Sequence, residues 1–169
     1  MNMLKLRPYE SRDAEKIAAW CADEAAFYKW SAGLLGGFPL SAERLERELS
    51  KMSENGRFYA LTAVDESGAV GFFIVRQPGD DEKELRFGFV IVSPEVRGKG
   101  YGKQMLRLGI DFAFTGCGAE KVSLGVFENN PSAYHCYKAV GLSENGQTAV
   151  YDLCGEKWNC IELEMRKIV

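Results

Sequence analysis

Residues 90–102 read Val90-Ile91-Val92-Ser93-Pro94-Glu95-Val96-Arg97-Gly98-Lys99-Gly100-Tyr101-Gly102, and a helical pattern continues from Lys103. The order is an apolar strand, a short basic turn rich in glycine, and the start of a helix. Glycine lets such a turn curl with its N–H groups directed inward, and a helix start adds unpaired N–H groups and the positive end of its dipole. The segment is therefore typical of a site for an anion of the phosphate type.

Two common phosphate-binding patterns do not fit this turn. The Walker pattern needs a glycine, four residues and then Gly-Lys-Ser/Thr, but Arg97 stands at its first position and Gln104 follows Gly102-Lys103. The dinucleotide pattern G-x-G-x-x-G starts at Gly98 and fails at Lys103, which stands where its third glycine belongs. What is present is Arg-x-x-Gly-x-Gly, from Arg97 to Gly102.

Composition limits the class of protein. A chain of 169 residues is most simply one domain, here taken as 1–169, with enough length for a sizeable core. The net charge of −3 gives no support to a nucleic-acid partner. The five cysteines include no C-x-x-C pair and there is one histidine, so we expect no metal site and reduced thiols. The N-terminus lacks the apolar core of a signal peptide, and no apolar run approaches a membrane span. We therefore expect a cytoplasmic protein.

Apolar periodicity and turn residues predict an α+β fold. The expected order is a strand at 4–7, a helix capped by Ser11 to about 21 with a continuation at 25–30, a helix capped by Ser41, strands at 58–64, 69–76 and 84–92, the helix after the glycine turn, a strand at 121–127, a helix from 131 ending by 141, and strands at 150–153 and 158–165. Along the strand at 84–92, alternation predicts Leu85, Phe87, Phe89 and Ile91 on one face. The antiparallel hairpin argues against a purely parallel sheet and for a mixed one.

A second motif follows the strand at 121–127. It reads Asn130-Pro131-Ser132-Ala133-Tyr134-His135-Cys136-Tyr137-Lys138-Ala139-Val140-Gly141-Leu142. With the glycine turn and the order of elements, it resembles the GNAT superfamily of N-acetyltransferases, whose last motif position is usually Phe rather than Leu142. The resemblance implies a mostly antiparallel mixed sheet of about seven strands with about four helices. Arg7-Pro8, Asp13-Ala14 and residues 87–89 are similar to the ribosomal-protein N-terminal acetyltransferase branch.

The resemblance also implies a site for acetyl-coenzyme A as acetyl donor. Backbone N–H groups of the glycine turn would hold the diphosphate, the splayed strand at 90–92 would pair with the pantetheine arm, and Tyr137 would hydrogen-bond the departing thiolate. Asn130 is expected both as a helix N-cap and near the coenzyme arm. The predicted coenzyme-binding residues are Val90, Ile91, Val92, Arg97, Gly98, Lys99, Gly100, Tyr101, Gly102, Asn130, Ala133 and Tyr137.

The sequence identifies the general base less clearly than the coenzyme-binding residues. A substrate ammonium must lose a proton before it attacks. Glu84 is the best carboxylate, since it begins the central strand on the face opposite Leu85 and Phe87, although an exposed charge at a strand end is the slightly favoured interpretation of it. A water relay through backbone carbonyls is the alternative. His135 lies two positions before Tyr137, faces elsewhere, and is expected at the surface.

The acceptor cannot be assigned from sequence. A protein N-terminus, a polyamine, an amino acid or an antibiotic amine would each fit. The first two helices and their loop supply Phe27, Tyr28, Trp30 and Phe38 for an acceptor pocket, and ordinary core packing is expected for at least half of these aromatics. The function predicted is direct acetyl transfer to a primary amine in a ternary complex. Two rivals are a non-catalytic acyl-coenzyme A sensor or interaction module on this fold and a nucleotide binder of another family. A homodimer through the terminal strands is possible.

Overall fold

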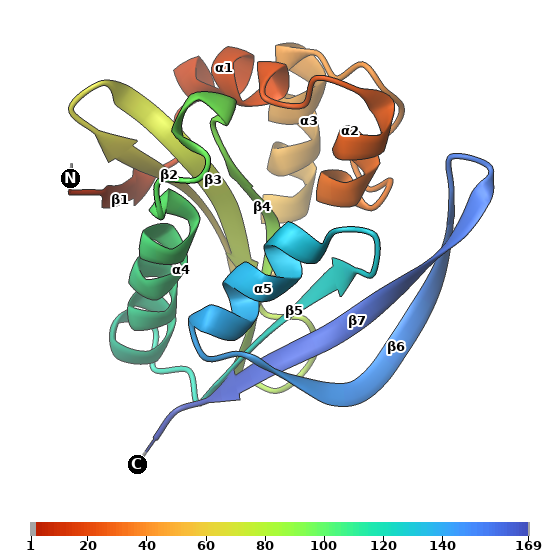
Figure 1. Cartoon of the computed structure of the whole chain (residues 1–169). Helices are drawn as coiled ribbons and strands as arrows, with labels where there is room; N and C mark the ends of the chain where they lie inside the picture. The colour runs from red at the N-terminus through yellow and green to blue at the C-terminus, as the bar shows by residue number, and fades with distance from the viewer. Residues whose placement is uncertain (1–2, 169) are drawn as a thin grey trace.

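The computed structural model describes residues 3–168 and has five α-helices against a seven-stranded sheet (Figure 1). In chain order the elements are β1 (Lys5–Pro8), a 3-10 turn (Ser11–Asp13), α1 (Ala14–Ala19), α2 (Glu24–Ser31), α3 (Ala42–Ser53), β2 (Phe58–Asp65), β3 (Gly68–Arg76), β4 (Glu84–Val92), a 3-10 turn (Pro94–Val96), α4 (Tyr101–Asp111), a π-helical turn (Phe112–Gly116), β5 (Lys121–Phe127), α5 (Pro131–Ala139), β6 (Ser143–Leu153) and β7 (Glu156–Arg166). The predicted α+β class is confirmed. β6 and β7 both begin before the predicted terminal strands.

The strands lie in the order β1-β2-β3-β4-β5-β7-β6. Every neighbouring pair is antiparallel except β4 and β5, which are parallel and pair only through residues 84–86 and 121–123. Beyond that point the two strands separate, while β4 stays bonded to β3 and β5 to β7. The sheet is therefore open at its centre, beside the end of β4 that leads into the glycine turn.

A bulge in β4 corrects the predicted alternation. Ile74 pairs with Gly88 and Phe72 with Ile91, so β4 has one residue more than β3 between these pairs, and Phe89 adopts a left-handed φ of 51°. Leu85 and Phe87 therefore pack in the cluster with α4, whereas Phe89 and Ile91 pack in the cluster with α1–α3. The prediction that all four share one face is wrong, because a bulge reverses the alternation that follows it.

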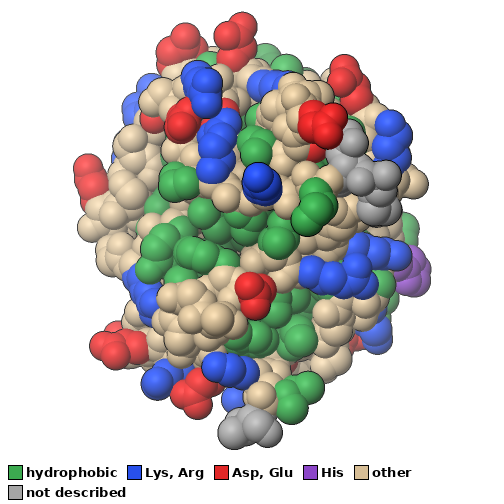
Figure 2. Space-filling model, turned by 90° about the vertical axis from the view of Figure 1, so that its left-hand side faces the viewer, with side chains coloured by type: hydrophobic (Ala, Val, Ile, Leu, Met, Phe, Trp, Pro, Cys, Tyr) green, Lys and Arg blue, Asp and Glu red, His purple; other side chains and the backbone are tan. Residues whose placement is uncertain are grey.

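Helices cover both faces of the sheet. The cluster on one face includes Tyr101 and Met105 of α4 and Tyr137 of α5, and the cluster on the other includes Ile17 of α1 and Leu45 of α3. Figure 2 views the molecule from the side of β1 and α4, where hydrophobic side chains gather in the middle of the face between charged ones. Both layers thus present residues to the central opening between β4 and β5.

Local capping explains where several helices begin. The Ser41 and Asn130 side chains accept hydrogen bonds from the N–H groups of Arg44 and Ala133, at 3.1 and 3.4 Å, so both predicted caps are confirmed. The Ser11 cap is wrong, because Ser11 lies inside the first turn. There the Glu10 N–H donates to the Asp13 carboxylate at 2.9 Å.

Asp13 joins this turn to the sheet. Its buried carboxylate accepts two hydrogen bonds from the Arg7 guanidinium, both at 2.8 Å, and one from Thr62 Oγ1 at 3.0 Å. Burial opposes ionisation, but the bonds from Arg7, the Glu10 N–H and Thr62 leave the pKa of Asp13 below its ordinary value. The start of α1 is thereby fixed to β1 and β2. Within residues 3–168, no helix has the length and apolarity that a membrane span requires.

Candidate functional site

The opening between β4 and β5 is part of a cavity of about 690 Å³. Its wall comes from β4, the glycine turn and the start of α4, from β5 and α5, and from α2 with the loop before it; the part at the glycine turn and the part at α2 are called its two ends. Members of both hydrophobic clusters line it, among them Tyr137 from one layer and Phe89 from the other. The cavity therefore passes through the sheet where the strands diverge, and two molecules entering from opposite faces could meet inside it.

The glycine turn forms an open cradle at one end. Gly98 and Gly100 have φ values of 78° and 81°, which L side chains rarely adopt, and nothing lies within 4 Å of the position that a Cβ would take at either residue. Gly102 lies in the first turn of α4, where N–H groups have no intrahelical partner. Backbone donors, open space and a helix start together fit a phosphate or diphosphate group.

Two of the three cations in and just after the glycine turn line the cavity. Arg97 and Lys103 are lining residues, and one Arg97 nitrogen donates to the Val92 carbonyl at 3.3 Å. Lys99 is exposed and does not line the cavity, so the structure does not bring it to the other predicted residues. Gly98 and Gly100 do line it, and so does Tyr101.

The last residues of β4 form one wall. Val90, Ile91 and Val92 line the cavity, as the sequence predicts. Because β5 has diverged, this edge of β4 has no strand partner, and its outward-directed N–H and C=O groups are available to a ligand. An extended chain with amide groups, such as a pantetheine arm, matches such an edge.

α5 forms the opposite wall. Asn130, Ala133 and Tyr137 line the cavity, with Asn130 also capping the helix. Tyr137 is 7% exposed, and its hydroxyl has no hydrogen-bond partner among residues 3–168. Burial, and to a lesser degree the neighbouring Cys136, raises the pKa of Tyr137 above its ordinary value of about 10, so the hydroxyl keeps its proton. Tyr137 can therefore donate a hydrogen bond into the cavity.

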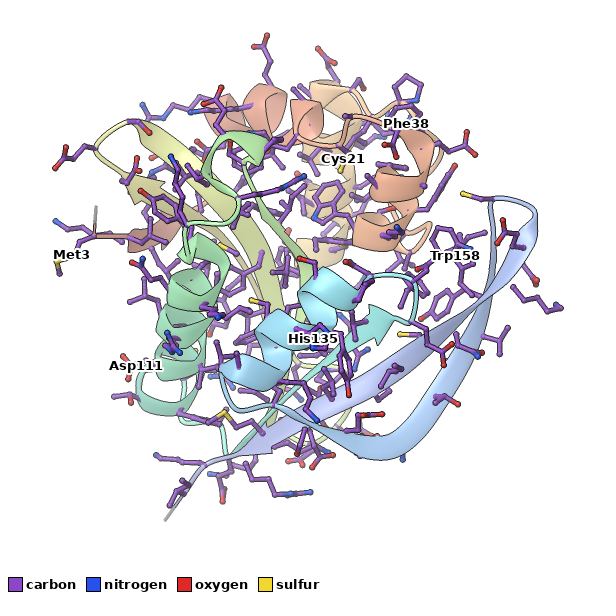
Figure 3. The ribbon with its side chains drawn as sticks, viewed as in Figure 1. Met3, Cys21, Phe38, Asp111, His135 and Trp158 are labelled. Atoms are coloured by element: carbon purple, nitrogen blue, oxygen red, sulfur yellow. The ribbon has the colours of Figure 1, made fainter. Side chains whose placement is uncertain are left out.

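His135 lies on the same helix but on its exposed side. It is labelled on α5 in Figure 3, and the purple side chain at the edge of Figure 2 is the only histidine. The predicted surface position is confirmed, and the structure adds that His135 borders the cavity.

The structure does not bring Glu84 to the cavity. Glu84 lies at the beginning of β4, in the part that still pairs with β5, and does not belong to the cavity wall. Its carboxylate accepts a hydrogen bond from Ser123 Oγ at 2.8 Å and lies 3.8 Å from Lys121 Nζ. The charge at this strand end is thus half-buried in the β4–β5 junction, whereas the alternative expected from the sequence was an exposed charge.

The far end of the cavity comes from the segment around α2. Trp30 lines it, but Phe27, Tyr28 and Phe38 pack around the core and do not. Sequence reasoning missed Cys21, Ala26 and Lys29, which also line this end. The spacing of Ala26, Lys29 and Trp30, at i, i+3 and i+4, places them on one helix face and was the available signal. Cys21 lies in the loop between α1 and α2 (Figure 3).

Known proteins resemble this chain over most of its length. The family model "Acetyltransferase (GNAT) domain" matches residues 3–143. A spermidine N(1)-acetyltransferase of Escherichia coli strain K12 is 25% identical over 146 residues, which are 86% of this chain and 76% of that protein. A spermidine N(1)-acetyltransferase of Vibrio cholerae is 35% identical over 57 residues, 34% of this chain and 33% of that protein.

Solved structures share the fold. The spermidine N-acetyltransferase from Vibrio cholerae in complex with CoA and spermine superposes with a TM-score of 0.81 at 22% identity, covering 97% of this chain and 95% of that one. A probable acetyltransferase superposes with a TM-score of 0.79 at 17% identity, covering 99% and 97%. The family match covers both the glycine turn and the α5 motif, and the cavity lies between them. This chain belongs to the GNAT family of acetyltransferases.

Proposed function

We propose that this acetyltransferase moves an acetyl group from acetyl-coenzyme A to a small primary amine by direct attack while both are bound. The observation that carries the proposal is the single cavity, which joins the phosphate-type cradle, the Tyr137 hydroxyl and the α2 segment. Such an arrangement accommodates a donor at one end and an acceptor at the other, with a hydrogen-bond donor between them.

The donor would be held mainly by backbone groups. The N–H groups around Gly98, Gly100 and Gly102 would bind the diphosphate, with Arg97 and Lys103 supplying charge. The free edge of residues 90–92 would pair with the pantetheine amides, and Asn130 and Ala133 would flank the arm. Tyr101 would complete the cradle, and we expect Lys99 to act only through its charge.

The chemistry needs one bond formed and one broken. Acetyl-coenzyme A supplies an acyl group activated as a thioester. The amine nitrogen bonds to the acetyl carbon, the carbon–sulfur bond breaks, and the amine loses a proton. Tyr137, protonated at neutral pH, would donate a hydrogen bond to the sulfur as it gains charge. A backbone N–H on the free edge of β4 would face the acetyl oxygen.

The cavity wall offers little for an acyl-cysteine route. Burial raises the pKa of Cys21 to about 11 and also raises the pKa of Cys136, so both lining thiols are protonated at neutral pH. A thiol is a much weaker nucleophile than a thiolate. This supports direct attack by the amine.

Proton removal is assigned to water. Glu84 was the carboxylate predicted for this step, but it does not line the cavity. A chain of waters along the unpaired edge of β4 would carry the proton outward. The cations in the cavity wall also lower the pKa of a bound ammonium, which increases the fraction of free amine.

A small-molecule amine is the acceptor class that we favour, because the similar bacterial enzymes are named for spermidine. A protein N-terminus, expected from the similarity to the ribosomal-protein branch, is the competing acceptor.

We propose that residues 1–169 form a single domain, since β7 pairs with β5 beyond the end of the family match. The cytoplasm remains the compartment that we propose, because all five thiols are free.

A homodimer through the terminal strands is also part of the proposal. β6 is the last strand at its edge of the sheet, and Val150 on it is 59% exposed. An unpaired strand edge is a template for a second chain. Light scattering during gel filtration should give twice the mass of one chain, and the mass of a single chain would contradict the dimer.

The proposed reaction is tested by thiol release. Calorimetry should show binding of acetyl-coenzyme A, and a panel of primary amines and N-terminal peptides should include acceptors that release free coenzyme A. A sensor would bind the donor without turnover of any panel member, and that result would reject the proposed function. Competition by ATP for the same site would instead favour a nucleotide binder.

A further inference from the structure

Within residues 3–168, the charged side chains of the cavity wall are all cationic. Among the residues described, the wall contains three permanent cations, Lys29, Arg97 and Lys103, and neither an aspartate nor a glutamate. A polyamine has an ammonium group at each end, and once one end is deprotonated for attack, a carboxylate is the best partner to replace water around the other. This cavity has none in its wall.

The three cations come from two parts of the wall, and Arg97 lies close enough to Cys21, just before α2, to lower the pKa of that thiol. Arg97 and Lys103 lie at the phosphate cradle, where the donor's phosphates would neutralise them. Lys29 lies at the α2 end with Cys21 and Trp30. It forms no ion pair with any residue from 3 to 168. With the donor bound, Lys29 is the cation left for the acceptor.

Two carboxylates on the surrounding elements are already engaged. Asp23 caps α2, accepting a hydrogen bond from the Ala26 N–H at 2.8 Å. Glu162 is paired with Arg86 through hydrogen bonds of 2.6 and 3.0 Å. Neither side chain lines the cavity, so neither balances the charge of Lys29 inside it.

Trp30 shapes this end of the cavity with its ring. The ring lies against Phe89, with the centroids 5.8 Å apart, and Nε1 is buried inside the protein, so a ligand in the cavity meets the ring rather than the N–H. Among the residues described, the ammonium group of Lys29 is therefore the charged group at this end, and it matches an oxygen anion rather than a cation.

We propose that the acceptor is a small primary amine carrying an anionic group, a carboxylate or a phosphate, which Lys29 binds at the α2 end of the cavity. This rests on the proposed acetyl transfer and specifies its acceptor. It separates this chain from the similar enzymes named for spermidine. The anionic group lies toward α2, and the amine lies toward Tyr137 and the unpaired edge of β4.

Matched acceptors test the charge directly. Thiol release is measured with 4-aminobutyrate, n-butylamine and putrescine, which have the same four-carbon chain and carry an anion, no charge or a second cation at the far end. Phosphoethanolamine and ethanolamine form a second pair, which distinguishes phosphate from carboxylate. α-Amino acids, spermidine and spermine complete the panel. We expect kcat/KM for the best anionic acceptor to exceed that of every polyamine by about tenfold or more.

Variants assign the effect to Lys29. Lys29→Gln should raise KM for the anionic acceptor about tenfold with kcat and donor affinity nearly unchanged, since the lost contact binds the far end of the acceptor. Lys29→Glu should lower anionic acceptance further and increase turnover of putrescine. Lys51→Gln is the control, because Lys51 on α3 is 62% exposed and does not line the cavity.

The outcomes separate this inference from the reaction itself. Preference for spermidine or putrescine in the unaltered protein would overturn the inference and leave acetyl transfer established. An unchanged KM in Lys29→Gln would also overturn it. Donor binding with no turnover of any acceptor would overturn the proposed function and this inference together. A preference for the anionic amine that Lys29→Gln removes would support both.

Discussion

The donor end of the cavity is built mainly from backbone groups, whereas its acceptor end is built from side chains around α2. Gly98 and Gly100 have left-handed φ values and open space beside them, and the edge of β4 has no strand partner. At the other end, Lys29 and Trp30 project from α2 and Cys21 from the loop before it. Backbone sites need particular residues, chiefly glycine, at fixed spacing. Side-chain sites can be changed one residue at a time, so the acceptor can differ between relatives that share a donor.

Tyr137 lies between the two ends, and its removal should have the largest effect. We expect Tyr137→Phe to lower kcat about 100-fold, because a buried hydrogen-bond donor to developing charge is lost. The affinity for acetyl-coenzyme A should stay within about twofold, since the ring and its packing remain. Steady-state kinetics and calorimetry measure the two quantities.

Tyr134→Phe is the matched control on the same helix. The Tyr134 hydroxyl donates to Glu144 at 2.5 Å and lies outside the cavity wall. Its loss should leave kcat unchanged. Equal losses in the two variants would mean that a general property of α5, rather than the Tyr137 hydroxyl, supports the rate.

The backbone character of the donor end is tested at Gly100. Its φ is 81° and a side chain there would occupy the open cradle, so Gly100→Val should raise the dissociation constant of acetyl-coenzyme A about 30-fold. Gly146→Val is the control, because Gly146 has a φ of 86° and equally open space but lies on β6. Both variants should lose similar stability. A similar loss of affinity in both would show that the effect comes from strain alone.

The difference between a donor end built from backbone groups and an acceptor end built from side chains also explains which features could be predicted from the sequence. The glycine turn and the Asn130–Tyr137 segment could be predicted from the sequence because capping, left-handed turns and helix starts each require particular residues. The free edge of β4 followed from the family resemblance. The bulge at Phe89 was not predictable, because alternation continues through it and a left-handed φ at Phe is rare. Without the bulge, Phe89 would not face α2.

Glu84 and Lys29 show the limit for side chains. Glu84 was the best candidate carboxylate for a base from its place on the central strand, but only the register of β4 with β5 shows that it faces Ser123. In the sequence, Lys29 cannot be distinguished from any lysine on a helix surface. In the structure, the loop after α1 positions α2 beside the cavity, and Lys29 lines it. Long-range packing decides both positions, and a single sequence does not record it.

The pH dependence of kcat/KM should show whether the acceptor amine or a group of the protein titrates during the reaction. No carboxylate lines the cavity among the residues described, so kcat/KM should rise about tenfold per pH unit until the pKa of the acceptor amine is reached. Burial raises the pKa of Tyr137, so its proton is retained at alkaline pH and the rate should not fall before about pH 10. A plateau that begins well below the pKa of the acceptor, and at the same pH for every acceptor, would instead indicate a protein base. An acceptor of lower pKa should reach its maximum at correspondingly lower pH.

Glu84→Gln should have the smallest effect, and it decides whether the base is a side chain or water. Because Glu84 lies in the paired part of β4 and not in the cavity wall, kcat/KM should stay within about twofold of the unaltered value. The amide oxygen can still accept from Ser123 Oγ, whereas the ion pair with Lys121, at 3.8 Å, is lost, so stability should fall by about 0.5 kcal/mol. Denaturant melts and thiol-release kinetics measure the two effects. A loss of activity well beyond twofold with stability retained would restore Glu84 as the base, and the acceptor end would then extend along β4 to its first residue.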